Sequence, residues 1–327
     1  MKNQRRTFIQ TLAGAALAPL PWVSLRAQTT YPAKPVTIVV ASTPGGQADL
    51  IARYLADEMS RALGKPFLID NKAGASGIAG LQYAAQRPAD GYTLAYGTGS
   101  WMAINPGFFP NLPYDPIKDF TPITQIGITP QCLMLGAHVP AKTLAEFIAL
   151  AKAAPGKYTF ASFGSGSSSH LQGEMLKGLA GIDMLHVPFK GSAQALMEVV
   201  AGRVDLFIID FAPAVSFIKE GRIRALAVTG NDRVAEFPDV ATFKELGYPL
   251  TLVGWNGLFT GAGTPPAIVN LLTEQFNKII QSPAGKAKLR QLGAVPTGTT
   301  SEAYRRILVE DIAKWRELVQ KSGAKPD

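Results

Sequence analysis

The sequence is poor in the residues that build covalent cross-links and metal sites. Of 327 residues, one is a cysteine and three are histidines. A single cysteine excludes an intramolecular disulfide. The three histidines form no cysteine-histidine ligand motif, so we expect neither a metal site nor a cofactor. Cys132 lies in the apolar run 131–135, which predicts a buried and inert thiol.

Motifs that mark nucleotide binding and hydrolysis are also missing. The chain has no G-x-x-x-x-G-K-[ST] phosphate loop and no G-x-S-x-G nucleophile elbow. Glycines 74, 77 and 80 follow a predicted strand, but their i, i+3 spacing favours close helix packing over a dinucleotide fingerprint. A hydrolase with Ser167 or Ser168 as nucleophile and His170 as base stays open as an alternative.

Charge points away from a nucleic-acid partner. Charged residues make up 17% of the chain and hydrophobic residues 47%, an ordinary globular balance, and the formal net charge is +8. Residues 1–27 hold four basic residues and no acid, so their removal lowers the net charge to +4. No basic run with interleaved aromatic residues remains, and we expect no nucleic-acid binding.

Residues 1–27 are typical of an export signal. A basic start precedes a short apolar stretch over residues 8–20, and residues 25–27 resemble a cleavage site. Arg5 and Arg6 fit a twin-arginine signal, although an ordinary secretory signal stays open. Either route predicts a periplasmic protein with a cleaved signal. No later segment is long and apolar enough to anchor the chain, so we expect a soluble product.

The rest of the chain alternates β-branched runs with helical patterns, which is typical of βαβ units around parallel sheets. A first series has strands near 36–40, 67–69 and 93–96, with a helix ended by Gly64. A second series begins near residue 144. Its predicted strands are 158–161, 184–187, 204–209 and 224–229. Helices are predicted over 144–153, 266–281, 284–292 and 302–319.

Two extended apolar stretches, 120–135 and 250–260, flank the second series and are interpreted as paired strands that cross between two lobes. The predicted fold class is therefore α/β with two lobes and a ligand cleft between them. The first lobe takes residues 28–127 and 253–327, and the second lobe takes residues 128–252.

Three loops that follow predicted strands are rich in glycine, serine and threonine. We call residues 41–46 the Pro-Gly-Gly loop, residues 97–100 the third loop and residues 163–168 the Gly/Ser loop. Glycine leaves amide hydrogens uncovered, hydroxyl groups add donors, and a helix N-terminus favours an anion. One such loop is most simply a turn. Three of them, from both lobes and at strand ends, predict a shared anion site.

Nine segments carry a family resemblance: 31–35, 44–49, 52–53, 71–80, 87–94, 112–115, 164–171, 186–191 and 202–205. Together they resemble the solute receptors of tripartite tricarboxylate transporters, the Bug family, through nearly all of the chain that follows the export signal. The resemblance implies a type II periplasmic-binding-protein fold whose lobes close on the ligand. It also implies that backbone amides and bridging waters hold a carboxylate.

Carried over to this chain, the resemblance implies ligand contacts at Ser42, Thr43, Gly45, Gly46, Asp49, Ser165, Gly166, Ser167, Ser168 and His170. Thr98 and Ser100 of the third loop, and Asp210 at a strand end, complete the candidate set. For Asp49, His170 and Asp210 a purely structural role stays open. Lys190 either complements a second carboxylate or is simply solvated. Ser42 stands where members commonly carry an aromatic residue, which weighs against small amino-acid-like ligands.

The predicted function is that of a monomeric solute-binding protein, not an enzyme. It captures a small organic carboxylate, of which dicarboxylates and aromatic carboxylates are the candidates, and hands it to membrane permease subunits. A ligand sensor for a membrane signalling partner is the alternative. The sequence does not name the carboxylate.

Overall fold

A computed structural model describes residues 31–235 and 237–322. The predicted export signal lies outside the described residues. In the part that is described, no helix combines the length and the apolar character needed to cross a membrane.

The first sheet is six-stranded and mixed. Its strands, in spatial order, are β11 (Val295–Pro296), β4 (Phe120–Thr129), β10 (Gly254–Gly261), β3 (Thr93–Thr98), β1 (Val36–Val40) and β2 (Phe67–Asn71). β1 pairs parallel with β2 and β3, whereas β10 is antiparallel to both β3 and β4. Ile38 and Val39 point to opposite faces of β1 and are both fully buried. Helices therefore cover both faces, as the continuous apolar run predicts.

The second sheet is five-stranded. Its strands, in spatial order, are β7 (Met184–Pro188), β6 (Tyr158–Ser162), β8 (Leu206–Asp210), β5 (Gln131–Gly136) and β9 (Ile223–Val228). β6 pairs parallel with β7 and β8, and β5 is antiparallel to β8 and β9. Cys132 on β5 is fully buried, which confirms the predicted burial, and burial raises the pKa of its thiol.

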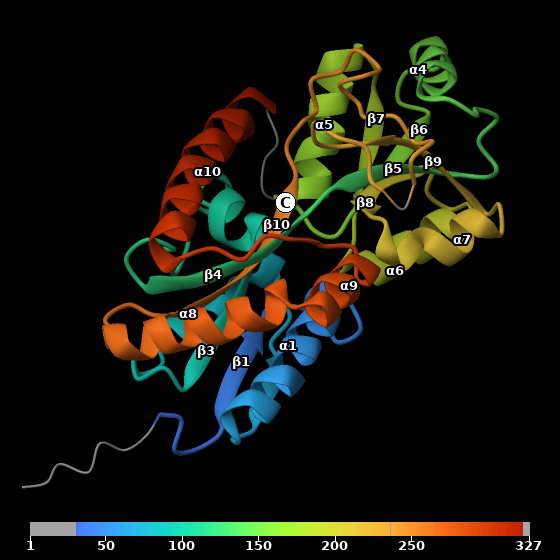
Figure 1. The fold of residues 1–327 in the computed structure, drawn as a ribbon. Helices are drawn as coiled ribbons and strands as arrows, with labels where there is room; N and C mark the ends of the chain where they lie inside the picture. The colour runs from blue at the N-terminus through green and yellow to red at the C-terminus, as the bar shows by residue number, and fades with distance from the viewer. Residues whose placement is uncertain (1–30, 236, 323–327) are drawn as a thin grey trace, which may run out of the picture. The chain divides into compact units, whose positions relative to one another are not determined.

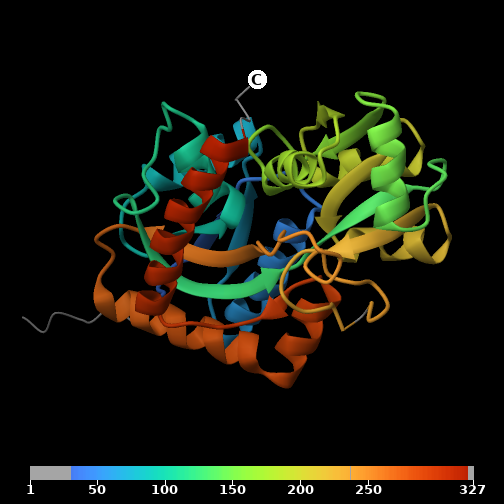
Figure 2. The same cartoon turned by 90° about the horizontal axis from the view of Figure 1, so that it is seen from above.

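Helices surround the two sheets. In the first lobe these are α1 (Gln47–Leu63), α2 (Ile78–Ala85), α3 (Asn105–Phe108), α8 (Pro266–Gln281), α9 (Pro283–Gln291) and α10 (Ser301–Ser322). In the second lobe they are α4 (Leu144–Ala153), α5 (Ser168–Ala180), α6 (Ser192–Val200) and α7 (Val215–Lys219). Short turns lie at η1 (Ala75–Gly77), η2 (Ser100–Ile104) and η3 (Ala212–Ala214). α10 and α8 cover opposite faces of the first sheet (Figure 2).

The chain changes sheet twice, next to the paired strands β4 and β10 (Figure 1). It leaves the first sheet after Thr129 and enters the second at Gln131, and it returns between Val228 and Gly254. The antiparallel pairing of β4 with β10 agrees with the predicted crossing strands. The lobe boundaries at 127/128 and 252/253 stay predictions.

Glycine positions explain two local features. Gly64 adopts a left-handed conformation (φ 64°) and ends α1, as predicted. Gly80 lies so close to β1 that a Cβ there would be 2.8 Å from the Cα of Ala41. Close packing therefore explains Gly80. Gly74 (φ 138°) and Gly77 (φ 82°) precede α2 and adopt a backbone conformation that favours glycine, so the predicted helix packing holds for one of the three glycines.

Candidate functional site

The three predicted loops follow strands whose carboxyl ends lie at the same edge of each sheet. β1 leads into the Pro-Gly-Gly loop and its parallel neighbour β3 leads into the third loop. In the second sheet, β6 leads into the Gly/Ser loop. The Pro-Gly-Gly loop opens α1 and the Gly/Ser loop opens α5, so each contributes the unpaired amides of a helix start.

The Pro-Gly-Gly loop is open to solvent. Thr43 and Gly45 are exposed, and Gly45 has a positive φ of 85°, which a residue with a side chain would resist. Gly46 is the N-cap of α1 and has no side chain to satisfy the first amides. The hydroxyl of Ser42 is buried without a hydrogen-bond partner in the described chain. The loop therefore offers both amides and a hydroxyl.

Asp49 holds this loop in shape. Its carboxylate, which is only 2% exposed, accepts hydrogen bonds from Gly45 N (2.9 Å), Arg53 Nε (3.0 Å) and Asn71 Nδ2 (2.9 Å). Asn71 also donates to the carbonyl of Ser42 (3.3 Å). Burial by itself would raise the pKa of Asp49, but these hydrogen bonds and the charge of Arg53 lower it below its ordinary value. These partners favour a positioning role for Asp49, and its contact with ligand stays a prediction.

Neutral groups hold the Gly/Ser loop. Ser167 is the N-cap of α5, where its hydroxyl accepts from His170 N (3.4 Å) and donates to the carbonyl of Gly164 (2.5 Å). Gly166 N donates to His170 Nδ1 (3.1 Å). A ring nitrogen that accepts from an amide carries no proton, so this contact requires a neutral His170 with its proton on Nε2. His170 thus fixes the backbone of the loop.

Contacts between the lobes bring the loops together. Ser168 N, at the start of α5, donates to Ser100 Oγ of the third loop (3.1 Å). Ser76 Oγ donates to the carbonyl of Ser165 (3.0 Å), and the ring of Phe108 lies edge-on to His170 with 6.0 Å between centroids. An amide predicted to bind an anion is therefore occupied by a hydroxyl from the opposite lobe.

Thr98, the other candidate residue of the third loop, ends β3, and its hydroxyl accepts a hydrogen bond from Trp101 N (3.3 Å). Asp210 ends β8 and is only partly exposed. Lys190 is exposed, which agrees with a solvated lysine.

Ser76 was missed by sequence reasoning. It is the non-glycine residue with a positive φ (53°) in the described chain, and such strain is concentrated at functional positions. Its carbonyl accepts from Asn105 Nδ2 (3.1 Å), and that amide also donates to Tyr114 (3.1 Å). The only signal was the glycine-rich run 71–80, whose spacing was assigned to helix packing.

A serine and a histidine side chain also meet beside the Gly/Ser loop. His186 Nε2 lies 2.7 Å from Ser162 Oγ, which is fully buried, and the ring of His186 stacks on that of His170 at 3.8 Å. The Nδ1 of His170 accepts the amide hydrogen of Gly166 (3.1 Å). Among the described residues, no group of three or more His, Cys, Asp and Glu side chains could hold a metal ion.

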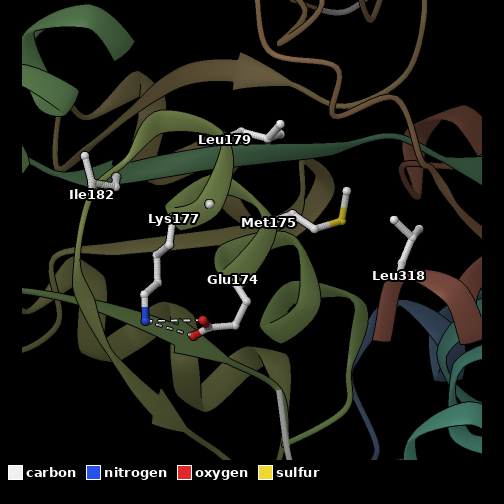
Figure 3. Close-up of a pocket in the computed structure, with 7 residues that line it drawn as sticks. Glu174, Met175, Lys177, Leu179, Ile182 and Leu318 are labelled. Atoms are coloured by element: carbon white, nitrogen blue, oxygen red, sulfur yellow. Dashed lines mark hydrogen bonds and ion pairs between the residues drawn. The ribbon is translucent and has the colours of Figure 1, made fainter. Parts of the chain in front are cut away.

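Two hollows lie away from the loops. One, of about 430 Å³, lies beside α5 and the end of α10. Lys177 and Glu174, which form an ion pair (3.2 Å), are among the residues that line it (Figure 3). The other, of about 290 Å³, lies next to the crossing strands and is lined by Phe211, Phe237 and Arg290. Neither contains a residue of the three loops.

Comparison with known proteins decides the family. Residues 51–324 match the model of the tripartite tricarboxylate transporter family receptor. The chain belongs to this receptor family. A curated relative, protein BugT of Bordetella pertussis, is 34% identical over 298 residues, which cover 90% of this chain and 91% of BugT.

Solved structures agree with this assignment. Rpa4515 of R. palustris, solved with adipate, superposes with a TM-score of 0.87 at 34% identity, over 91% of this receptor and all of that chain. MatC of Rhodopseudomonas palustris, solved with bound malate, gives a TM-score of 0.83 at 31% identity, over 88% of this receptor and all of that chain. The receptor therefore has the predicted two-lobed periplasmic-binding-protein fold.

Proposed function

We propose that this receptor captures a small organic carboxylate in the periplasm and presents it to the membrane subunits of a tripartite tricarboxylate transporter. The hydrogen bond from Ser168 N to Ser100 Oγ carries the proposal, because it shows a helix start of one lobe facing a loop of the other. An anion bound there would be reached from both lobes at once. Adipate and malate, which occupy two relatives, are the first probes.

The proposed contacts are residues of the three loops: Ser42, Thr43, Gly45, Gly46, Thr98, Ser100, Ser165, Gly166, Ser167 and Ser168. The amides of Gly45, Gly166 and Ser168 donate within the protein, so a bound anion replaces or shares these partners. Asp49 and His170 hold the loops in place. Oriented amides and hydroxyls bind a carboxylate through charge-assisted hydrogen bonds, which are stronger than those between neutral groups. The receptor acts as a monomer and releases its ligand unchanged. Recovery of a modified ligand after incubation would instead support an enzyme.

Gly46 provides a sharp test of this site. Its φ of −77° lies within the range that proline imposes, so Gly46→Pro removes the amide hydrogen with little change in φ. Gly46→Ala keeps the amide, and its Cβ would meet only Thr43 O at 3.9 Å. By calorimetry with adipate and malate, we expect the proline variant to bind about 10- to 100-fold more weakly, and the alanine variant to bind like the wild type. Equal affinities would place the anion elsewhere.

Localisation is tested separately. We expect mass spectrometry of the periplasmic protein to show cleavage near Ala27. If the twin-arginine route is used, replacing Arg5 and Arg6 by lysine blocks export. Unimpaired export of that variant would identify the ordinary secretory route. A periplasmic protein that retains residues 1–20 would contradict the predicted cleavage.

A further inference from the structure

A carboxyl group that has no cationic partner in the described part of the chain lies beside the Gly/Ser loop. Asp210 is the last residue of β8, which runs parallel to β6, and Ala161 of β6 pairs with Phe207 of β8. Since neighbouring strands are about 4.8 Å apart, both strands end at the same edge. Asp210 therefore stands next to the start of the Gly/Ser loop and is partly open to the space in front of it.

Polar groups from two other strands face the same position. Gln131 of β5 pairs with Asp210 in the ladder, and its side chain hydrogen-bonds the carboxyl group. Tyr96 of β3, in the first lobe, lies near enough for the charge of Asp210 to raise the pKa of the tyrosine further than burial alone. Within the described residues, Tyr96 Oη and Gln131 Oε1 are buried and have no hydrogen-bond partner. Such groups call for a polar ligand atom or water.

The charges around Asp210 differ from those around Asp49. No ion pair reaches Asp210 within residues 31–235 and 237–322, whereas Asp49 is paired with Arg53. Burial raises the pKa of Asp210 to about 7, and the hydrogen bond from Gln131 only partly opposes this. The carboxyl group therefore carries a proton in a large fraction of molecules at neutral pH.

Other titratable groups near this position do not supply a positive charge. Tyr304 of α10 lies behind Tyr96, and burial raises the pKa of both phenols, so both stay protonated. Lys219 of α7 and Arg290 of α9 line the neighbouring hollow and are exposed to solvent, as is Lys190 after β7.

We propose that Asp210, Tyr96 and Gln131 form a subsite for the distal carboxylate of a dicarboxylate. In this subsite the carboxyl group of Asp210 and the distal carboxylate of the ligand share one proton. This inference rests on the proposed function. The hydroxyl of protonated Asp210 donates to the ligand carboxylate, and the Tyr96 hydroxyl donates to the same group. When Asp210 is ionised in the free receptor, binding a dianion takes one proton from solvent, because two carboxylates face to face in a buried site repel each other. The affinity for a dicarboxylate therefore falls as the pH rises above about 7.

The experiment is calorimetry of the mature receptor with adipate between pH 6 and pH 9, in pairs of buffers with different ionisation enthalpies. We expect uptake of up to about one proton and a loss of affinity approaching about tenfold per pH unit at the alkaline end. Hexanoate, which has the same chain length and one carboxylate, serves as the matched ligand. Its binding takes up no proton and does not depend on pH in this range.

Two variants separate the roles of the residues. Asp210→Asn keeps a neutral donor of the same shape, so it binds adipate without proton uptake and with a flat pH profile. Tyr96→Phe weakens adipate binding about 5- to 10-fold but keeps the proton uptake, because the proton belongs to Asp210. Circular dichroism and thermal unfolding of both variants confirm that they are folded.

The outcomes distinguish this subsite from the site as a whole. Proton release on adipate binding, proton uptake that persists in Asp210→Asn, or the same pH dependence for hexanoate and adipate would overturn the subsite alone. No heat with adipate, malate and hexanoate alike would overturn the proposed function and the subsite with it.

Discussion

The Pro-Gly-Gly loop and the Gly/Ser loop share one plan, a strand that runs into a helix, but different chemistry holds each in place. In the first, a single buried carboxylate, Asp49, accepts the amide hydrogen of the exposed Gly45. In the second, Gly166 and His170 are buried, and a neutral imidazole and serine hydroxyls tie the backbone.

The difference follows from access to water. Arg53, the partner of Asp49, has a side chain that is 49% exposed, so its charge stays hydrated while it orders the loop. At the Gly/Ser loop, where Phe108 covers Gly166, a charge would lose its hydration, which costs several kcal/mol unless it is paired. Solvent access thus decides which kind of anchor each loop can use.

The largest effect is expected where the Gly/Ser loop is most tightly packed. Gly166 has φ 78°, and a Cβ there would lie 2.4 Å from the ring of Phe108. We expect Gly166→Ala to lower the free energy of unfolding by about 2–5 kcal/mol, from backbone strain and overpacking together. Urea unfolding measures the change.

Gly181→Ala is the matched control for this prediction. Gly181 has φ 62° and nothing within 4 Å of its Cβ position, so only the backbone cost applies, about 1–2 kcal/mol. Adding Phe108→Ala to Gly166→Ala should recover part of the loss by making room. Equal costs for the two glycine substitutions would mean that the contact between the lobes is not tight.

A smaller loss in the free energy of unfolding is expected from a substitution at Asp49, which holds the Pro-Gly-Gly loop. Asp49→Ala leaves Gly45 N and Asn71 Nδ2 without their partner, which costs about 1–3 kcal/mol, while Arg53 turns to solvent. Asp57→Ala, at an exposed position of the same helix, is the control and should change stability by less than about 0.5 kcal/mol. If both variants unfold at the same urea concentration, Asp49 does not anchor the loop.

The Asp49 carboxylate that holds the Pro-Gly-Gly loop also predicts a loss of stability in acid, which the neutral groups of the Gly/Ser loop do not. The folded pKa of Asp49 lies below its unfolded value, so its contribution is complete above about pH 4 and is lost as the pH falls through the folded pKa. Asp49→Asn should therefore lose less stability than the wild type between about pH 4 and pH 2. Thermal unfolding at several pH values tests this. An equal loss of stability in the wild type and in Asp49→Asn between about pH 4 and pH 2 would contradict it.

The smallest effect is expected from salt and from Lys190. Neutral donors in a closed cleft are poorly screened, so adipate affinity should change little between 0.05 M and 0.5 M salt.

Lys190→Ala should change the binding free energy of adipate by less than about 0.5 kcal/mol, because this lysine is exposed. A steep salt dependence that disappears in the Lys190 variant would place the anion beside Lys190.

Sequence reasoning recovered what local patterns encode. β1 and α8 have their predicted bounds, and Gly64 ends α1, because apolar periodicity and the left-handed glycine are local signals. The three loops were also found locally, from their glycines and hydroxyls. Their contacts with ligand stay predictions.

What the sequence did not indicate depends on pairing across the fold. Asn71 reaches Asp49 from 22 residues away, and Ser76 reaches Ser165 from 89 residues away. In the sequence, Tyr96 looks like another residue of a buried strand. Only the fold brings Asp210 of β8 near its hydroxyl. No period or spacing contains such information.

The position of β10 in the first sheet governs the order in which the chain can fold during synthesis. This strand lies between β3 and β4, although both precede it by more than a hundred residues. All strands of the second sheet leave the ribosome, and on the ordinary secretory route the membrane channel, before β10 does. The second lobe can therefore close while β3 and β4 still present unpaired edges. Open edges of this kind promote aggregation. A nascent chain halted before residue 254 should therefore need a chaperone far more than one halted shortly after Gly261.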